Sequence, residues 1–272
     1  MWIRCGILAF GTINQEEIPS MKLQRKDEII RLAAENRVIK ANELSELFQV
    51  SMETIRRDLT DLEKSGVIRR IHGGAVLNVA NSIEPDYSYR EIKNYEEKLL
   101  IGRRAASLVE DGETIIIDIG TTALEFARFL KGKKKITVLT NSLKIALELM
   151  DDADITVIIL GGVVRYGEGT SSGFWAEDMV DRFYAEKLFL GVGALDARSG
   201  IMDYHIEETN LRRHYITHSK KVIAMADYSK FGIKALNEVC TPDRIDCLIT
   251  DEKADKKILK ELRERGIEII VT

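Results

Sequence analysis

The sequence predicts an α/β protein in which a small N-terminal winged helix-turn-helix domain precedes a larger, Rossmann-like domain built on a parallel sheet. Three observations lead to this fold class. Within residues 21–77, two short amphipathic helices joined by three residues precede an alternating, glycine-containing stretch. From residue 87 onward, apolar runs rich in β-branched residues alternate with helical patterns. The residues between them, 78–86, are polar and lack periodicity, which is typical of a linker.

Length and composition agree with two domains. The chain has 272 residues, of which 45% are hydrophobic and 31% charged, and a formal net charge of −4, which argues against a uniformly basic coat. No stretch has the roughly 18 uninterrupted apolar residues of a membrane span. Cys5, Cys240 and Cys247 cannot all pair, and their spacing is unlike that of zinc ligands. We therefore expect a reduced, cytoplasmic chain without metal.

The N-terminal residues 1–20 form an extension that we expect to be disordered. The opening MWIRCGILAF loosely resembles a signal peptide, but Arg4 interrupts its apolar run and no small-residue cleavage site follows. Met21 is the more natural first residue of the folded protein. The intact mass of the natively expressed protein tests this hypothesis, because a mass that includes Met1 would contradict it.

The first domain, 21–77, is predicted to hold three helices and a hairpin. KDEIIRLAAEN and ANELSELF are amphipathic, with Asn42 as the expected N-cap of the second helix. After QVS, a third helix runs from Ser51 to about Lys64 and ends at Gly66. VIRRIHGGAVL alternates around Gly73-Gly74, as in a β-hairpin.

The third helix carries the candidate DNA contacts. A helical wheel places Met52, Ile55, Leu59 and Leu62 toward the core and Arg57 on the opposite side. A solvated face with an Arg57–Glu53 pair is one interpretation. The other is DNA, because the exposed face of this helix in a helix-turn-helix lies in the major groove. The candidates on the helix and the following wing are Ser51, Thr54, Arg56, Arg57, Thr60, Arg69, Arg70 and His72.

The second domain, 87–272, is predicted to contain a parallel sheet covered by helices on both faces. Its expected strands are TIIID, ITVLT, ITVIIL, KLFLGVG, KVIAMA, DCLIT and IEIIV. The first strand leads into DIGTT, where a glycine turn precedes a helix. Such a junction aims backbone N–H groups and the positive helix end at one point, and the hydroxyls of Thr121 and Thr122 add donors, which together suit a phosphate. The candidate effector-binding residues of this stretch are Asp118, Gly120, Thr121 and Thr122. An ordinary turn with a threonine N-cap is the alternative, and neither GxGxxG nor GxxxxGK[ST] is present.

Other strand ends carry similar residues. Because the carboxyl ends of parallel strands share one edge of the sheet, these residues are predicted to meet in a single crevice. They are Asn141, Gly161, Gly162, Gly191, Gly193, Asp227 and Lys230. Taken singly, each is as readily a turn or packing residue. RYGEGTSSGFWAEDMV is expected to cover the crevice, with Arg165, Glu168 and Trp175 as selectivity residues or as ordinary loop packing.

Both halves resemble one family. ANELSELFQVSMETIRRDLTDLEKSGVIRRIHGGA resembles the N-terminal domain of DeoR-type bacterial transcriptional regulators, and Ile92 to Thr272 resemble their sensor domain, which is related to ribose-5-phosphate isomerase and glucosamine-6-phosphate deaminase. The resemblance implies an operator-binding protein, usually a repressor of sugar or nucleoside catabolism, in which DIGTT holds the phosphate of a sugar-phosphate effector. The family's Glu and Lys correspond to Glu207 and Arg212. Arg in place of Lys keeps the charge but changes the geometry.

The predicted function is thus a repressor of a sugar catabolism operon, released by a phosphorylated sugar. Its expected partners are operator DNA, the effector and further copies of itself, as a homodimer or homotetramer, with no cofactor, no metal, no membrane and no catalytic residue. The alternative is a sugar-phosphate isomerase or deaminase with a DNA-binding appendage. The isomerases carry a DGADE-like cluster where this chain has GVGALDA, which leaves one carboxylate, Asp196. A third interpretation gives the sheet domain a role in oligomerisation alone.

Overall fold

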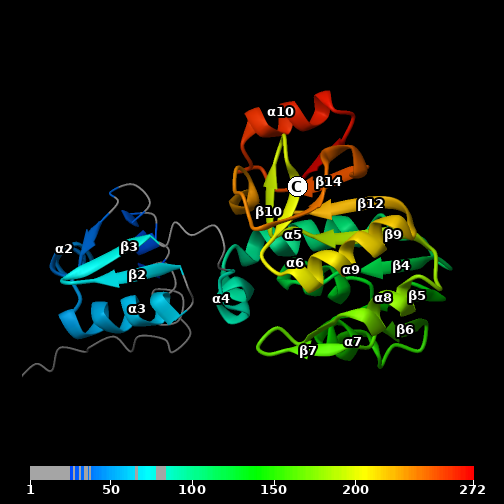
Figure 1. Ribbon diagram of the computed structural model, residues 1–272, viewed down its shortest axis with the longest axis horizontal. Coiled ribbons are helices and arrows are strands. Elements are labelled where there is room, and N and C mark those ends of the chain that lie inside the picture. The colour runs from blue at the N-terminus through cyan, green and yellow to red at the C-terminus, as the bar shows by residue number, and fades with distance from the viewer. Residues whose placement is uncertain are drawn as a thin grey trace, which may run out of the picture. The chain divides into compact units, whose positions relative to one another are not determined.

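A computed structural model describes residues 25–26, 28–30, 32–33, 36, 38–64, 67–77 and 84–272, which fall into two compact units divided between Val79 and Ala80 (Figure 1). Four predictions therefore lie outside the described residues: the extension 1–20, the start at Met21, the helix end at Gly66 and the linker over 78–83. The last three linker residues, 84–86, are described and have neither helix nor strand.

The first unit contains the expected helix-turn-helix and hairpin. Helix α2 (Ala41–Phe48) is followed by α3 (Met52–Lys64), and Gln49 in the turn has the left-handed φ of 52°. Strands β2 (Ile68–Ile71) and β3 (Gly74–Leu77) form the hairpin, and β1 (Ile39–Lys40) pairs with β3 (Figure 1).

Two details of the first unit differ from the prediction. Asn42 is not the N-cap, because α2 begins directly after β1 and Lys40 is the capping residue. Met52 is 38% exposed, whereas Ile55, Leu59 and Leu62 are buried. Met52 is the first residue of α3, so it lies at the end of the apolar stripe and beyond its packing partners.

The second unit is built on the predicted parallel sheet. Its seven strands have the order β15-β14-β12-β9-β4-β5-β6 and all pairs are parallel. In that order the strands are Glu268–Val271, Cys247–Thr250, Ser219–Met225, Ala185–Gly191, Thr114–Ile117, Ile136–Thr140 and Ile155–Ile159. The seven apolar runs of the sequence became these seven strands, so the predicted fold class is confirmed.

Helices cover both faces of this sheet. One buried cluster joins it to α5 (Tyr95–Ala106), α6 (Thr121–Arg128) and α7 (Leu143–Leu149). The other joins it to α8 (Phe174–Val180), α9 (Ile206–Thr217) and α10 (Lys256–Glu264). Each face thereby excludes water from the apolar strands. No described helix is both long and apolar enough to cross a membrane.

Small elements that the sequence did not reveal surround the strand ends. Helix α4 (Tyr87–Ile92) precedes α5, and the hairpin β7 (Val163–Arg165) and β8 (Thr170–Ser172) follows β6. Strands β10 (Ala194–Asp196), β11 (Gly200–Asp203) and β13 (Asn237–Cys240) form a separate antiparallel sheet, and two short 3-10 helices span Tyr228–Lys230 and Pro242–Arg244. Cys240 and Cys247 are buried free thiols.

Candidate functional site

The exposed side of α3 carries most of the candidate DNA contacts. Ser51 caps the helix, since its Oγ accepts the Thr54 N–H at 3.1 Å. Arg56 and Arg57 are exposed. Among the described residues, no ion pair joins Arg57 to Glu53, so the pairing expected for a merely solvated face is not formed. Within the described part of the chain, neither the Arg56 nor the Arg57 guanidinium has a side-chain partner, so a ligand can contact both.

The wing is fastened to the same helix. The Arg70 N–H donates to Glu63 Oε1 at 3.0 Å, and Arg70 Nη1 donates to Thr60 Oγ1 at 3.2 Å. Arg69 and His72 are exposed on β2 and its turn. The structure thus joins Thr60 and Arg70, two of the candidate contacts, across α3 and the wing.

A carboxylate that the sequence did not indicate lies on the buried face of α3. Asp58 is 1% exposed and accepts a hydrogen bond from Arg25 Nε at 2.6 Å. Its position between Ile55 and Leu59 on the apolar stripe could have revealed it in the sequence, because a carboxylate on a buried stripe needs a charged or hydrogen-bonding partner. The pair ties α3 to the residues that precede β1.

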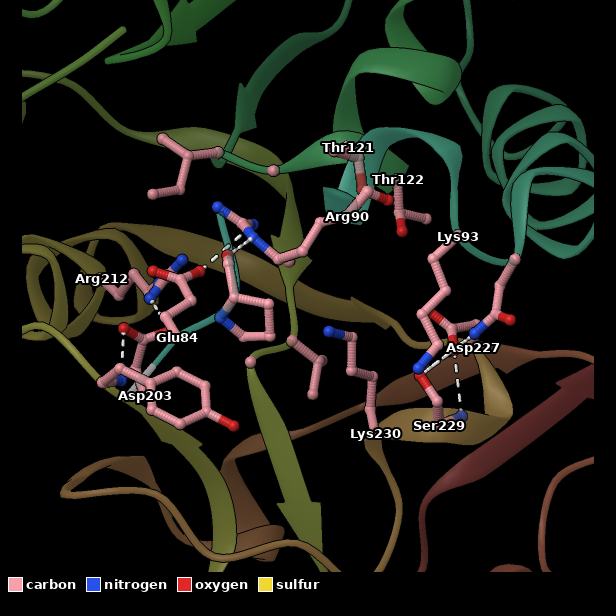
Figure 2. Close-up of a pocket in the computed structure, with 18 residues that line it drawn as sticks. Glu84, Arg90, Lys93, Thr121, Thr122, Asp203, Arg212, Asp227, Ser229 and Lys230 are labelled. Atoms are coloured by element: carbon pink, nitrogen blue, oxygen red, sulfur yellow. Dashed lines mark hydrogen bonds and ion pairs between the residues drawn. The ribbon is translucent and has the colours of Figure 1, made fainter. Parts of the chain in front are cut away.

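The second unit has a crevice at the carboxyl ends of β4, β9 and β12 (Figure 2). Eight of the residues predicted from strand ends and the family resemblance line it: Gly120, Thr121, Thr122, Gly191, Gly193, Arg212, Asp227 and Lys230. The same crevice is lined by residues that the sequence did not indicate, among them Glu84, Arg90, Lys93, Asn94 and Asp203. Most of these lie between residues 84 and 94, at the start of the second unit. The many charged residues of that stretch were the only feature of the sequence that could have indicated them.

Two positive features that the sequence predicted, the start of α6 and Lys230, face the crevice. Helix α6 begins at Thr121 after Gly120, whose φ of 113° favours glycine, and no side chain caps this end. The Lys230 side chain points into the crevice (Figure 2). Burial lowers the pKa of Lys230, and the nearby Asp227 carboxylate opposes this shift. An ammonium group and the first N–H groups of a helix together suit an anion.

The hydroxyl of Thr121 is already in use, contrary to the expectation that it would serve as a free donor. Thr121 Oγ1 donates to the Arg90 carbonyl at 3.3 Å and accepts from Lys98 Nζ at 3.3 Å. Thr122 is the second threonine at this helix end and lines the crevice. Thr121 therefore joins α4 to α6.

Arg212 is held by two buried carboxylates beside the crevice. Its Nε donates to Asp118 Oδ2 at 2.8 Å, and its Nη1 lies 2.5 Å from Asp203 Oδ2. Burial alone would lower the pKa of Arg212, but Asp118 and Asp203 outweigh it and raise that pKa well above its ordinary value. Asp118 itself does not line the crevice, because it is turned toward Arg212 and the Gly191 N–H, 3.0 Å away.

Gly191 and Gly193 serve close packing at this point. A Cβ on Gly191 would come within 2.4 Å of the Ile119 carbonyl oxygen, and one on Gly193 within 2.7 Å of Asp203 Oδ2. Neither position has room for a side chain. These glycines let the chain pass over the buried carboxylates while still lining the crevice.

Besides Asp118, four predicted residues do not line the crevice. Asn141 is buried and donates to the Ser171 carbonyl at 2.7 Å while accepting from Tyr215 at 2.9 Å, so the β7–β8 hairpin covers it. Gly161 and Gly162 follow the edge strand β6 and lead into that hairpin. Glu207 is exposed beside His205. The carboxylate of α9 that points inward is its neighbour Glu208, which is 2% exposed.

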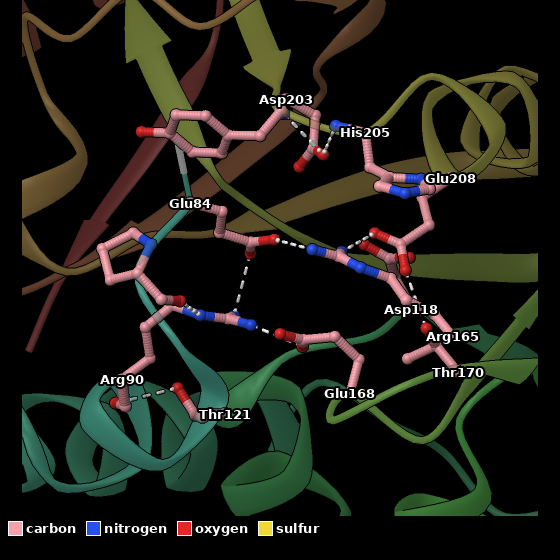
Figure 3. A network of polar contacts seen from close by, with 12 residues as sticks. Glu84, Arg90, Asp118, Thr121, Arg165, Glu168, Thr170, Asp203, His205 and Glu208 are labelled. Carbon is pink, nitrogen blue, oxygen red and sulfur yellow. Dashed lines mark hydrogen bonds and ion pairs between the residues drawn. The ribbon is translucent and has the colours of Figure 1, made fainter. Parts of the chain in front are cut away.

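The predicted selectivity residues separate in the structure. Arg165 and Glu168 lie in a polar network with Glu84 and Arg90 (Figure 3). Trp175 is 67% exposed and lies edge-on to Phe174. Trp175 does not line the crevice.

Lys98 is a buried cation behind the crevice. It is 1% exposed and donates to the carbonyl oxygens of Arg90 and Glu91 and to Thr121. Burial lowers its pKa from 10.5 to about 8, although Asp227 opposes the shift. Lys98 thus fixes the end of α4 against the start of α6.

This lowered pKa predicts a pH dependence of stability. Between pH 8 and 10.5 the unfolded chain binds more protons at Lys98 than the folded chain, so stability rises with pH. We expect the free energy of unfolding, measured in urea, to rise by about 1 kcal/mol per pH unit relative to Lys98→Met. Lys260→Met, which removes a 76% exposed lysine, should keep the wild-type slope. Equal slopes for wild type and Lys98→Met would contradict the prediction.

Comparisons with known proteins cover both units. A family model described as the DeoR C terminal sensor domain matches residues 93–252, and one described as the DeoR-like helix-turn-helix domain matches residues 25–80. The HTH-type transcriptional regulator GolR of Listeria innocua is 36% identical over 246 residues, which cover 90% of this chain and 97% of that protein. The glycerol-3-phosphate regulon repressor of Escherichia coli strain K12 is 31% identical over 246 residues, with coverage of 90% and 97%. A crystal structure of ribose 5 phosphate isomerase A from Neisseria gonorrhoeae matches with a TM-score of 0.37 at 20% identity, covering 49% of this chain and 52% of that one.

Proposed function

Because the chain belongs to the DeoR family of transcriptional regulators, we propose that it represses a carbohydrate-utilisation operon and leaves its operator when a phosphorylated sugar binds the crevice. The helix-turn-helix unit reads the DNA and the α/β unit reads the metabolite. A symmetric operator requires at least two copies of α3, so the chain acts as a homodimer or homotetramer.

The arrangement of positive groups in the crevice carries the effector proposal. Lys230 and the uncapped start of α6 face the same space, while the neighbouring Arg212 is neutralised by Asp118 and Asp203. A phosphate is the group that such a pair of donors recognises best. The name of the glycerol-3-phosphate regulon repressor agrees with this chemistry.

The geometry of Asp196 speaks against it as the base of the isomerase alternative. Isomerisation requires a carboxylate base over the substrate carbon. Asp196 instead accepts the N–H groups of Arg198 at 3.0 Å and Ser199 at 2.9 Å in a turn, and it does not line the crevice. The Ser199 N–H bond outweighs the opposing effect of burial and lowers the pKa of Asp196, which makes it a weaker base.

Fluorescence anisotropy tests the proposal. The full chain is titrated onto DNA from upstream of its own coding region at fixed salt, with and without sugar phosphates and the matching unphosphorylated sugars. We expect binding that one phosphorylated sugar abolishes. Binding that no sugar phosphate changes would leave the DNA-binding role and remove the effector. Turnover of a sugar phosphate by a chain that ignores the DNA would favour the enzyme.

Lys230 provides a sharper test of the crevice. We expect Lys230→Met to weaken binding of the releasing sugar phosphate at least about tenfold, since a hydrogen bond to a charged group contributes about 1.5–3 kcal/mol. Operator affinity without effector should be unchanged. Lys234→Met, a nearby exposed lysine that does not line the crevice, is the control. An unchanged effector affinity in Lys230→Met would place the phosphate elsewhere.

A further inference from the structure

Five charged side chains form a row of alternating sign (Figure 3), and two of them, Glu84 and Arg90, line the crevice. Glu168 Oε2 lies 2.5 Å from Arg90 Nη2, and Arg90 Nη1 lies 3.1 Å from Glu84 Oε1. Glu84 Oε2 lies 3.0 Å from Arg165 Nη2, and Arg165 Nη1 lies 2.9 Å from Glu208 Oε2. The carboxylate of Glu84 therefore bridges two guanidinium groups, each of which has a second carboxylate of its own.

Glu84 differs from the other two carboxylates in how it is held. Glu208 belongs to α9 and also accepts a hydrogen bond from Thr170 at 2.7 Å. Glu168 lies in the turn of the β7–β8 hairpin. Glu84 itself lies in neither helix nor strand, and it is the first described residue of the second unit. Among the three carboxylates of the charged network, Glu84 thus has the least support from regular secondary structure.

Glu84 also borders two hollows at once. It lines the crevice of Lys230 and Thr122, and it lines a second hollow bounded by Tyr87 and Lys144. Burial raises the pKa of Glu84, and Arg90 offsets this only in part. The charged form of Glu84 is therefore destabilised by the loss of its hydration. The two hollows beside it give another anion access to Arg90 and Arg165.

We propose that Arg90 and Arg165 form a second anionic subsite of the effector, which Glu84 occupies until a carboxylate on the effector displaces it. This inference rests on the proposed function, because the phosphate of the same effector would bind at α6 and Lys230. The ligand class is then a phosphorylated sugar acid rather than a neutral sugar phosphate. Glu84 itself shows that a carboxylate fits between the two guanidinium groups with both oxygens bonded.

Displacement of Glu84 gives the ligand a route to the DNA-binding unit. Arg90 also holds this stretch through its Nε, which donates to the Pro85 carbonyl at 2.8 Å. When an effector carboxylate takes the arginines, the chain before α4 loses its ionic attachment. The polypeptide before Glu84 leads to the helix-turn-helix unit. Effector binding and the ionic attachment of Glu84 therefore exclude each other, which couples the two units.

Two matched ligands and two matched variants test the subsite by isothermal titration calorimetry on the full chain. 3-Phosphoglycerate and glycerol 3-phosphate share a phosphorylated three-carbon skeleton and differ in the carboxylate. We expect Glu84→Gln to bind 3-phosphoglycerate about tenfold more tightly than wild type and glycerol 3-phosphate equally well. Glu97→Gln is the control, since Glu97 has the same 12% exposure and pairs with Lys253 outside the crevice.

Hydrogen exchange of α4 separates this inference from the proposed function. Even without ligand, Glu84→Gln should speed exchange of the amides of Arg90 and Lys93 about tenfold, whereas Glu97→Gln should not. Faster exchange without phosphate binding would overturn the proposed function and, with it, the second subsite. Unchanged exchange, or an equal gain in affinity for both ligands, would overturn the subsite while leaving the phosphate site intact.

Discussion

We expect Arg57→Ala to weaken operator binding about 5- to 150-fold, which corresponds to the roughly 1–3 kcal/mol of one specific arginine contact. Arg57 is exposed on α3, opposite the buried Ile55, Leu59 and Leu62. Removing its side chain should therefore cost little stability. Anisotropy with labelled operator measures the effect, and calorimetry should show unchanged affinity for the effector, because Arg57 belongs to the other unit.

Salt dependence identifies the kind of contact that Arg57 makes. If it binds a phosphate, Arg57→Ala lowers affinity on all sequences and reduces the slope of affinity against salt by about one ion. If it binds a base, the slope stays and discrimination between operator variants falls. Lys64→Ala, at the exposed C-terminal end of the same helix, is the control. Full operator affinity in Arg57→Ala would remove α3 as the reading helix.

The elements of the fold could be predicted because their patterns are local. The stripe on α3 and the seven apolar runs each carry their own periodicity, and α/β alternation implies a parallel sheet. The small sheet of β10, β11 and β13 could not be predicted in this way. Its strands have only three or four residues each, and β11 is paired to β13 across the whole of α9 and β12.

The candidate site was predicted in part, and strand order explains the remainder. Strands β4, β9 and β12 are neighbours, so Thr122, Gly193 and Lys230, which follow them, reach one crevice. Strands β5 and β6 lie at one side of the sheet, where the hairpin covers Asn141. Sequence periodicity does not give the order of strands. It equally gives no sign that Glu84, in a stretch without periodicity, is bonded to Arg90 and Arg165.

The buried ion pairs of Arg212 lead to the largest expected loss of stability. Arg212→Met leaves Asp118 and Asp203, which are 1% and 2% exposed, without their cation. Breaking such a pair costs about 3–5 kcal/mol. For a protein of this size the thermal midpoint should fall by on the order of 10 °C. Arg213→Met, which removes the exposed neighbour, should stay near wild type.

The pH dependence of this loss gives a second measurement. In Arg212→Met the two carboxyls are buried without a cation, so their folded pKa values lie above the unfolded values and the folded chain binds more protons. Stability of the variant should therefore fall as pH rises, and the gap to wild type should be widest near neutral pH and narrower near pH 5. Arg212→Lys should be intermediate, because one ammonium cannot reproduce the Nε and Nη1 contacts to both carboxylates. A gap that is the same at both pH values would mean that lost packing, rather than unpaired charge, destabilises the variant.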